Sequence, residues 1–365
     1  MRIPETMRAV VLTAHGGMDK LELHNDWPVP KPDNNEVMIK VAACGMNNTD
    51  VNTRSGWYSK SVSEATTGEA YDSVGTNDPS WGGAAISFPR IQGADVAGTI
   101  VATGKGVDKS LIGKRVITDT WLRDWNDAMN RDKLGFFGSE CDGGYADFTT
   151  IDFRNIGIIE SDCSDAELAT FSCSYSTAEG MLSRANVTEK DTVLITGASG
   201  GVGSALIQLA KRRGAKVVGL ASVEKHAELA NLGADILLAR KPDSLADTLR
   251  KSIGTDKVSV VADIVGGNIY PELIESLERG GRYTCSGAIA GPIVELDLRT
   301  LYLNDLTFTG STALPPETFK DLIKYIENKE IKPMLAATYP IEDFHAAQQA
   351  FIDKRHTGNI VVTMT

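Results

Sequence analysis

The stretch DTVLITGASGGVGSALIQLAKRRGAKVVGLAS, residues 191–222, carries the strongest fold signal in the chain. Val193–Ile195 is an apolar run of strand length that leads into the glycine-rich turn GASGGVG, residues 197–203. In the helix expected next, apolar side chains recur on one face, and a KRR run occupies the last turn, where positive charge suits the helix dipole. Gly214 fits the end of that helix, and a second strand is expected from Lys216. Strand, glycine turn, helix and strand in this order predict one unit of a parallel α/β sheet.

The glycine-rich turn has the composition of a phosphate-binding loop. Gly200 would let the backbone approach a pyrophosphate without an obstructing Cβ, and Gly203 would let the helix pack close to the strand. The free N–H groups of the first helical turn would then bind the phosphates. The turn follows the GxGxxG pattern of dinucleotide-binding folds, with Ala198 at the first glycine position. A strand–helix turn that binds no ligand is the alternative. The candidate cofactor-binding residues here are Ala198, Ser199, Gly200, Gly201, Val202 and Gly203.

The end of the second strand indicates which nucleotide is bound. NAD-binding folds usually carry an acid there, about 20 residues after the turn, to hold the ribose 2′-hydroxyl. Ser222 stands at that position, and its small side chain leaves room for a 2′-phosphate that Lys225 could pair with. NADPH is therefore the predicted cofactor. Two alternatives remain: Glu224 could hold the ribose and select NADH, or Glu224 and Lys225 could merely begin a solvated helix.

The two parts of the chain have different periodicities. From about residue 165, helical and strand patterns alternate, which predicts a parallel sheet with helices on both faces. This part is expected to start with one helix near 165–186. The first part instead shows short β-type runs, such as Val37–Ala42, broken by Gly, Pro, Asp and Asn. Within it, the polar stretch Ser59–Gly83 is long for a connection inside a domain, and its aromatic residues favour a lid or rim over disorder.

Composition and charge exclude several classes of protein. The 365 residues include 37 Lys and Arg against 48 Asp and Glu, a net charge of 37 − 48 = −11, and they contain no basic run. Nucleic acids and anionic membranes are therefore not expected partners. The five cysteines are scattered without a CxxC pair, which argues against a disulfide framework or a Cys-rich structural zinc site. We find no signal peptide or membrane-spanning run, so a cytoplasmic protein is expected.

Further motifs make the chain resemble the medium-chain dehydrogenase/reductase superfamily, in particular its zinc-free branch of quinone oxidoreductase-like and enoyl reductase-like proteins. The segment GMNNTDVNTRSGWY is similar to that branch's G-x-N-x-x-D-x-x-x-R-x-G pattern, and the others follow in the family's order and spacing. The segments that carry the resemblance are residues 45–58, GADVAGTIVATGKGV at 93–107, GGYADF at 143–148, AxGGVG at 198–203, DIVGG at 263–267 and HTGNIVV at 356–362.

This resemblance implies the fold class and the domain limits. It implies an α/β protein in which a GroES-like, β-rich catalytic domain accompanies a Rossmann domain with a doubly wound parallel sheet. The catalytic domain would comprise residues 1–165 and 314–365, and the NADP-binding Rossmann domain residues 166–313. Relatives pair the edge strands of their Rossmann sheets, so a homodimer is expected. The corresponding edge strand here would lie near Leu301–Gly310.

Many relatives hold a catalytic zinc ion through a Cys, a His and a second Cys. The resemblance places Asn47 at the first of these positions, Ala94 at the second and Cys173 at the third. One thiolate cannot make a three-ligand site with an open position. The four-Cys lobe that holds a structural zinc ion in relatives is also missing. We therefore predict that the protein binds no zinc.

The resemblance also implies a reaction. Without a metal ion to lower the pKa of a hydroxyl group, oxidation of an alcohol is harder than reduction of a polarised acceptor. Zinc-free relatives reduce quinones, or the C=C bond of enones and enoyl thioesters. We therefore expect NADPH-dependent hydride transfer to such a small-molecule substrate. The alternatives are an NAD(P)-dependent alcohol or aldehyde dehydrogenase and a non-catalytic NADPH-binding protein.

Three candidate catalytic residues lie in the matched segments. Asn47 could donate a hydrogen bond to the substrate or the nicotinamide, and Tyr58 could be a proton donor or an aromatic wall. Thr177 would lie beside the nicotinamide if the family geometry holds. Asp50 is expected to orient Asn47 or Arg54 rather than to titrate during catalysis.

Two further candidates would flank the nicotinamide at the carboxyl end of the sheet, namely Ser286 and Gly287. Two positions depart from the family pattern. Asn52 stands where quinone reductases usually carry a Tyr, and Asn359 stands where the terminal segment usually carries a Lys. The first departure weakens a direct transfer of quinone chemistry to this chain.

Overall fold

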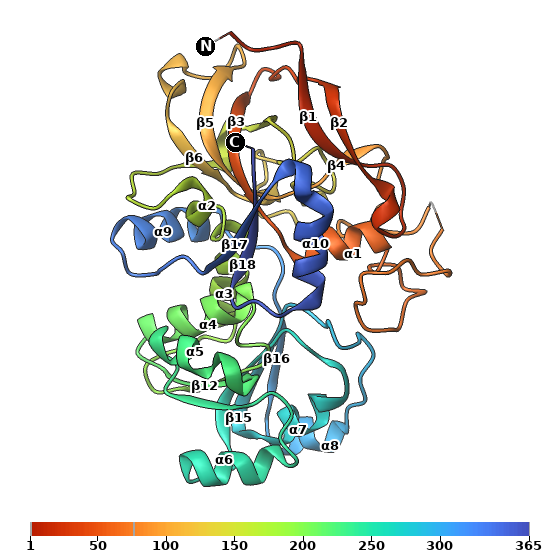
Figure 1. The fold of residues 1–365 in the computed structure, drawn as a ribbon. Coiled ribbons are helices and arrows are strands. Elements are labelled where there is room, and N and C mark those ends of the chain that lie inside the picture. The colour runs from red at the N-terminus through yellow and green to blue at the C-terminus, as the bar shows by residue number, and fades with distance from the viewer. Residues whose placement is uncertain (1, 76, 365) are drawn as a thin grey trace. The chain divides into compact units, whose positions relative to one another are not determined.

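The structure is a computed structural model that describes residues 2–75 and 77–364. The chain divides into two compact units (Figure 1). The first unit comprises Met1–Val62, Thr67–Cys173 and Pro315–Thr365, and the second comprises Ser63–Thr66 and Ser174–Leu314. The predicted domains, residues 1–165 with 314–365 and residues 166–313, have other limits than these two units, and they stay predictions.

The second unit is built on a six-stranded parallel sheet of order β13-β12-β11-β14-β15-β16. The chain runs outward from β11 in one direction and then restarts beside it with β14, so the strand order reverses between these two strands. The strands are β11 (Thr192–Ile195), β12 (Lys216–Ala221), β13 (Ile236–Ala239), β14 (Val258–Asp263), β15 (Leu277–Cys285) and β16 (Thr307–Gly310).

Helices connect these parallel strands and lie along the sheet (Figure 1). Leu194, Val218 and Val261, from the three adjacent strands β11, β12 and β14, are fully buried in the core between sheet and helices. This arrangement confirms the Rossmann part of the predicted fold class. The helices are α3 (Ser172–Arg184), α4 (Gly201–Arg212), α5 (His226–Asn231), α6 (Leu245–Ile253), α7 (Tyr270–Glu275) and α8 (Leu298–Leu303).

Two predicted elements of the chain after residue 165 differ from the structure, the first wholly and the second in part. The single helix near 165–186 is two helices, because α2 (Asp165–Leu168) ends before α3 begins at Ser172. The edge strand expected at Leu301–Gly310 is only partly a strand. Its first residues complete helix α8, whose first turn Asp297 caps by accepting a hydrogen bond from the backbone N–H of Arg299. The strand β16 itself does lie at the edge of the sheet.

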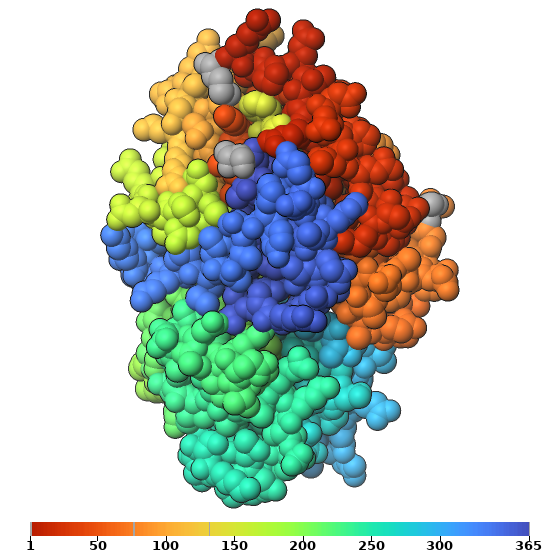
Figure 2. Space-filling view, viewed as in Figure 1, coloured from red at the N-terminus to blue at the C-terminus, as the bar shows by residue number. Residues whose placement is uncertain are grey.

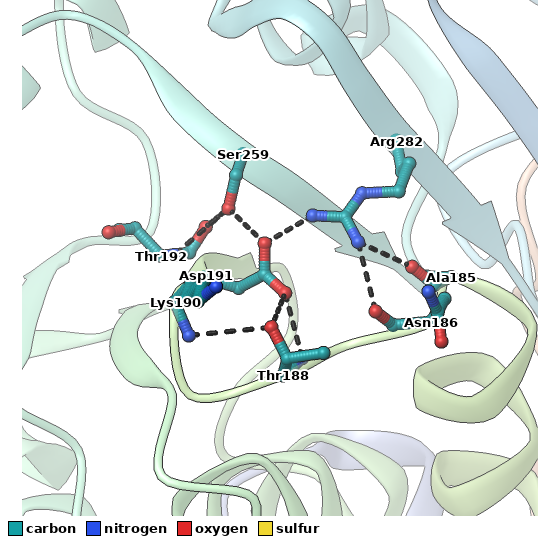
Figure 3. Close-up of polar contacts among 8 residues, drawn as sticks. All are labelled: Ala185, Asn186, Thr188, Lys190, Asp191, Thr192, Ser259 and Arg282. Atoms are coloured by element: carbon teal, nitrogen blue, oxygen red, sulfur yellow. Dashed lines mark hydrogen bonds and ion pairs between the residues drawn. The ribbon is translucent and has the colours of Figure 1, made fainter.

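A buried carboxylate joins the amino ends of the central strands (Figure 3). Asp191, just before β11, accepts hydrogen bonds from the backbone N–H of Thr188 and from the hydroxyl of Ser259, both at 2.8 Å, and pairs with Arg282. Arg282 also donates to two carbonyl oxygens just past the end of α3, at 3.0 Å each. Burial alone would raise the pKa of Asp191, but these hydrogen bonds and the Arg282 charge lower it overall.

The first unit contains a larger, mostly antiparallel sheet of order β10-β6-β5-β3-β18-β17, with β9 also paired to β3. Two small sheets, β2-β1-β4 and β7-β8, complete it. The strands are β1 (Thr6–Leu12), β2 (Leu21–Pro28), β3 (Glu36–Gly45), β4 (Arg90–Ile91), β5 (Asp95–Thr103), β6 (Arg115–Thr118), β7 (Trp121–Leu122), β8 (Gly135–Phe136), β9 (Phe148–Asp152), β10 (Ile156–Ile158), β17 (Leu335–Pro340) and β18 (Asn359–Thr363). The helices are α1 (Asn48–Ser55), α2, α9 (Pro316–Glu327) and α10 (Phe344–Asp353).

Segments from both ends of the sequence build this first unit. Figure 2 shows the C-terminal segment in blue against the N-terminal segment in red on the visible face. The Nε2 atom of His345 in α10 lies 2.9 Å from the backbone oxygen of Leu21, and Arg8 in β1 donates hydrogen bonds to Asp147. The return of the chain after residue 314 is therefore integral to the β-rich unit.

The stretch Ser59–Gly83 is a turn-rich connection with its own hydrogen bonds. The hydroxyl of Ser59 and the backbone N–H of Gly75 both donate to Oδ2 of Asp78, at 3.0 and 2.9 Å. We refer to it as the 59–83 segment. Its role as a lid or rim stays a prediction. Within residues 2–75 and 77–364, no helix has the length and apolar character needed to span a bilayer.

Candidate functional site

The glycine-rich turn lies at the carboxyl end of β11, in the second unit. Gly197 has a φ of +57°, and Gly200 caps α4 without a side chain. The first amide bonded within the helix is that of Ser204, which donates to the oxygen of Gly200 at 2.8 Å. The amides before it are the donors that a helix leaves without intrahelical acceptors. A phosphate held there would also meet the positive end of the helix dipole.

The glycines of the turn serve different purposes. A Cβ on Gly203 would lie 2.2 Å from the backbone oxygen of Gly197, so only glycine permits the predicted close packing of helix and strand. A Cβ on Gly200 would meet the same oxygen at 3.6 Å, an ordinary contact. The protein itself therefore has room for a side chain at Gly200. The clearance it leaves fits the predicted approach of a pyrophosphate, so the residues present fit a dinucleotide cofactor.

Ala198 faces the protein interior. It is fully buried, and its backbone N–H donates to the oxygen of Leu220 at 3.1 Å, which ties the turn to β12. The residues Ser199, Gly200, Gly201 and Val202 are partly exposed. The surface open to a ligand is thus formed by these four residues, while Ala198 and Gly203 shape the turn from beneath.

Asp263, at the end of β14, organises the neighbouring loops and was not predicted as a site residue. It is fully buried and accepts hydrogen bonds from the hydroxyls of Thr196 at 2.6 Å and Tyr283 at 2.7 Å. It also accepts from the backbone N–H groups of Val265 and Gly266. One carboxylate therefore links the carboxyl ends of three adjacent strands. The DIVGG motif contains it, but the sequence does not reveal its partners.

Ser286 and Gly287 follow β15 at the same end of the sheet. The hydroxyl of Ser286 donates to the oxygen of Ser311 at 2.6 Å, which ties this loop to the chain after β16. A Cβ on Gly287 would lie 3.0 Å from the oxygen of Ile264, so the loop after β14 is close. Their predicted place beside a nicotinamide stays a prediction.

The end of β12 gathers charged side chains. Ser222 follows β12, and its hydroxyl lies within hydrogen-bonding reach of the Glu224 carboxylate. Arg240 follows the adjacent strand β13 and acts electrostatically on Lys225. Burial lowers the pKa of Lys225, and Arg240 lowers it further, against the opposite effect of Glu224. Sequence reasoning missed Arg240, although it directly follows the strand next to Ser222. Lys225 and Arg240 therefore both lie near the end of β12, where the sequence predicts a 2′-phosphate.

In the first unit, the start of α1 carries a buried carboxylate. The backbone N–H of Asn47 donates to Oδ2 of Asp50 at 2.8 Å, which confirms that Asp50 orients Asn47. The hydroxyl of Tyr145 donates to the same oxygen at 2.8 Å. The guanidinium of Arg54 instead donates to Gln348, Gly16 and Gly68. Burial raises the pKa of Asp50 to about 6, against the lowering effect of the bonds from Asn47 and Tyr145.

A second buried carboxylate lies beside Asn47. Asp95, at the start of β5, accepts a hydrogen bond from the backbone N–H of Cys173 at 2.8 Å. Burial raises the pKa of Asp95 to about 7, and the nearby Asn47 amide opposes this rise. The Nδ2 atom of Asn47 is buried beside this carboxylate, close enough to act on it, but it makes no hydrogen bond of good geometry. A buried amide donor without an acceptor is costly, and a ligand oxygen would satisfy it.

Tyr58 lies in the same neighbourhood. Its hydroxyl interacts with Asn52, and Cys173, Asp50 and Glu140 are close enough to act on it electrostatically. Burial raises the pKa of Tyr58, so its hydroxyl is a neutral hydrogen-bond donor at physiological pH. The structure therefore brings Asn47 and Tyr58 to one region, together with Asp50 and Cys173.

Thr177 belongs to the second unit. It lies one helical turn after Cys173 on α3 and is partly exposed. Its relation to Asn47 and Tyr58 in the first unit stays a prediction. Asp95 and Tyr145 were not predicted, because both reach the site from strands and loops far from residue 47 in the sequence.

The residues at the three zinc-ligand positions of the family do not fit a zinc ion. They are the amide of Asn47, the methyl of Ala94 and the thiol of Cys173. The rings of Trp121 and Phe136 pack with Ala94 and Cys173 in one buried cluster. Over the described part of the chain, no group of three or more His, Cys, Asp or Glu side chains is arranged to hold a metal ion. Amide and methyl groups cannot replace two zinc ligands.

Comparisons with known proteins match both parts of the chain to described families. Residues 33–161 match the alcohol dehydrogenase GroES-like domain, and residues 201–328 match the zinc-binding dehydrogenase family. The acryloyl-coenzyme A reductase of Metallosphaera sedula is 27% identical over 98% of this chain and 100% of its own length. The quinone oxidoreductase of Mus musculus is 29% identical over 98% of each chain.

Solved structures match over the same length. One from Sinorhizobium meliloti 1021, provisionally described as an alcohol dehydrogenase, is 44% identical, covers 99% of this chain and 97% of its own, and has a TM-score of 0.90. A mycobacterial protein in complex with NADPH is 25% identical over 98% of this chain and 100% of its own, with a TM-score of 0.78. Since two domain families and a relative of 44% identity together account for nearly its whole length, this chain belongs to the medium-chain dehydrogenase/reductase superfamily of oxidoreductases.

Proposed function

We propose that the protein is an NADPH-dependent reductase that transfers hydride to an activated acceptor without zinc. The acceptor would be a quinone, an α,β-unsaturated carbonyl compound or an enoyl thioester. The observation that carries this proposal is the buried Nδ2 of Asn47, an amide donor that makes no well-formed hydrogen bond, at a position where zinc-dependent relatives hold a metal ligand. The similarity to an acryloyl-coenzyme A reductase and a quinone oxidoreductase supports the same class of acceptor.

The residues divide the work as follows. NADPH, when bound, would supply the hydride. The Asn47 amide and the neutral Tyr58 hydroxyl would donate hydrogen bonds to the acceptor oxygen as negative charge develops on it. Asp50 would keep Asn47 in place through the backbone hydrogen bond at the start of α1. Thr177, Ser286 and Gly287 would position the nicotinamide.

The choice of NADPH rests on the end of β12. Lys225 and Arg240 would pair with a 2′-phosphate, and the small Ser222 side chain would leave space for it. The mycobacterial relative in complex with NADPH supports this choice. NADH would instead require Glu224 to hold a ribose hydroxyl, beside two cations that favour a phosphate.

The test is a panel of substrates assayed in both directions. Purified, chelator-washed protein should oxidise NADPH with enones, enoyl thioesters or quinones and contain less than stoichiometric zinc. If simple alcohols reduce NADP⁺ and the activated acceptors are not turned over, the protein is an alcohol dehydrogenase. That is the activity provisionally given to the Sinorhizobium relative. Tight NADPH binding without any turnover would favour a non-catalytic binding protein.

We also propose that the chain forms a homodimer through the edge of its second-unit sheet. The edge strand β16 follows α8, in which Leu298, Tyr302 and Leu303 are 64%, 61% and 56% exposed. An exposed apolar helix beside an open strand edge is a surface that a second copy would cover. Light scattering that finds a monomer would contradict this proposal. We further propose that the protein acts in the cytoplasm on a small-molecule substrate.

A further inference from the structure

Arg54 is the largest fully buried side chain of the first unit, with 0% exposure. Its guanidinium donates three hydrogen bonds: Nε to the side-chain oxygen of Gln348 at 2.8 Å, one terminal nitrogen to the oxygen of Gly16 at 2.7 Å, and the other to the oxygen of Gly68 at 2.8 Å. Among the described residues no carboxylate lies within ion-pair distance of it, although Glu69 and Asp19 are close enough to act on its charge. Arginine is rarely buried without an ion-pair partner, since its charge is costly to desolvate.

The three acceptors belong to three separate segments. Gly16 lies in the turn after β1, Gly68 lies in the middle of the 59–83 segment, and Gln348 lies in α10. Gly68 has a φ of +84°, and a Cβ there would lie 2.7 Å from Cδ1 of Ile352, also in α10. The planar guanidinium has donors in fixed directions and can bond three acceptors on different sides, whereas the ammonium group of a lysine is a compact point charge. Arg54 thus fixes the middle of the 59–83 segment against α10.

Both ends of the 59–83 segment return to the candidate site. The segment starts directly after Tyr58, whose hydroxyl is influenced by Cys173 and Asp50. Near its other end, the ring centroid of Trp81 lies 4.9 Å from that of Trp121. Trp121 belongs to the buried cluster that also contains Cys173. The residue after Trp81 is anchored as well, because the backbone N–H of Gly82 donates to Glu140 at 3.0 Å. The segment therefore forms a loop whose two ends lie at the site and whose middle is held by Arg54.

We propose that Arg54 is a positioning residue for the acceptor: by holding Gly68, it fixes the 59–83 segment so that Tyr58 and Trp81 form one side of the acceptor site. This inference rests on the proposed function, because it assigns the first unit's site to the acceptor. Arg54 itself contacts no reacting group. Since Gly68, the residue that Arg54 holds, belongs to the first unit and the glycine-rich turn to the second, the effect of Arg54 should appear in acceptor binding and not in binding of the nucleotide.

The experiment compares four variants of the full chain. Arg54→Met removes all three hydrogen bonds at similar volume, Arg54→Lys keeps the charge, and Gly68→Ala disturbs the same contact from the segment's side. The matched control is Arg115→Met, since Arg115 also bonds two backbone oxygens and a side chain of the first unit, at Ser161, Cys163 and Asp165, away from the segment. The readouts are the KM for acceptor, kcat, the Kd for NADPH and the rate of proteolytic cleavage within residues 59–83.

The expected result is selective. Arg54→Met and Gly68→Ala should raise the acceptor KM by about tenfold or more, the effect of losing about one charge-assisted hydrogen bond, with a smaller change in kcat. Arg54→Lys should fall between Arg54→Met and the wild type. The Kd for NADPH should stay within about twofold, and cleavage of the segment should accelerate in proportion to the KM change. Arg115→Met should alter neither the acceptor KM nor the cleavage rate.

Different outcomes separate this inference from the proposed function. If Arg54→Met and Gly68→Ala lower the unfolding temperature as Arg115→Met does but leave the acceptor KM unchanged, Arg54 has a purely structural role and the inference is wrong. If Arg54→Met does not fold, Arg54→Lys and Gly68→Ala decide by the same readouts. If the wild type binds NADPH but reduces no activated acceptor, the proposed function fails. The rate of proteolytic cleavage within residues 59–83 then still reports whether Arg54 holds the segment. A rate in Arg54→Met equal to that of the wild type would show that Arg54 does not hold it.

Discussion

The hydroxyl of Tyr145 donates a 2.8 Å hydrogen bond to the Oδ2 atom of Asp50, the same oxygen that accepts the backbone N–H of Asn47. One buried carboxylate oxygen thereby joins the segment after β8 to the first turn of α1. Its two donors offset part of the cost of burying the charge. The position of Asn47, the residue on which the proposed chemistry depends, is therefore coupled to a tyrosine far away in the sequence.

Tyr145→Phe should reduce the free energy of unfolding by about 2 kcal/mol near pH 8, because it leaves a buried carboxylate with one donor fewer. The loss should be smaller at pH 5, where Asp50, with a pKa of about 6, is protonated. Urea unfolding at both pH values measures it. In an Asp50→Asn background the same substitution should cost less, and an equal cost in both backgrounds would show that the two side chains are not coupled.

Asp95→Asn should flatten the dependence of stability on pH. The folded protein retains the Asp95 proton up to a pH of about 7, whereas an unfolded chain releases it near pH 4, so stability falls as the pH rises between these values. The difference in unfolding free energy, variant minus wild type, should increase by on the order of 2–4 kcal/mol between pH 4 and pH 8. Urea unfolding across this range measures the effect, and the exposed Asp26→Asn is the control. Parallel curves for wild type and Asp95→Asn would contradict the prediction.

Lys225→Ala and Arg240→Ala should each raise the KM for NADPH by about tenfold, since each would lose an ion pair with the 2′-phosphate. The KM for NADH, which lacks this phosphate, should change little. Steady-state kinetics with both nucleotides measure the difference. Lys241→Ala, an exposed lysine beside Arg240, is the matched control. Equal effects on the two nucleotides would argue against phosphate recognition at this place.

Asp191→Asn should destabilise the second unit by about 2–3 kcal/mol at pH 7, because Arg282 and the Thr188 amide lose a charged acceptor. The pKa of Asp191 is lowered in the folded protein, so its contribution is complete above about pH 4 and is lost as the pH falls further. The gap between variant and wild type should therefore narrow below pH 4 in urea unfolding. A gap that stays constant down to pH 2 would contradict this account.

The geometry of the glycine-rich turn could be predicted from the sequence because it is local. Gly197, Gly200 and Gly203 lie within one turn, and their spacing relative to a strand and a helix fixes their geometry. The fold class followed from the same periodicity. The orientation of Asn47 by Asp50 was also predictable, since the two residues are three positions apart at a helix start.

The rest of the candidate site depends on contacts between distant segments. Asp95 meets the backbone of Cys173, and Tyr145 meets Asp50, only after the β-rich unit has folded. Arg240 comes next to Ser222 only through the pairing of β12 with β13. Helix α8 was missed for another reason: its leucines and tyrosine suit a strand equally well, and the Asp297 cap decides in favour of a helix.

The position of β18 in the first-unit sheet has a consequence for biosynthesis. This strand lies between β17 and β3, although it follows every other strand in the chain. On the ribosome, the segment that makes the nucleotide-binding sheet is complete before residues 359–363 emerge. Until they do, β17 and the end of β3 at residues 43–45, which β9 does not cover, present open edges that can pair with other chains. The β-rich unit can therefore complete its main sheet only after the whole second unit and residues 359–363 have been synthesised.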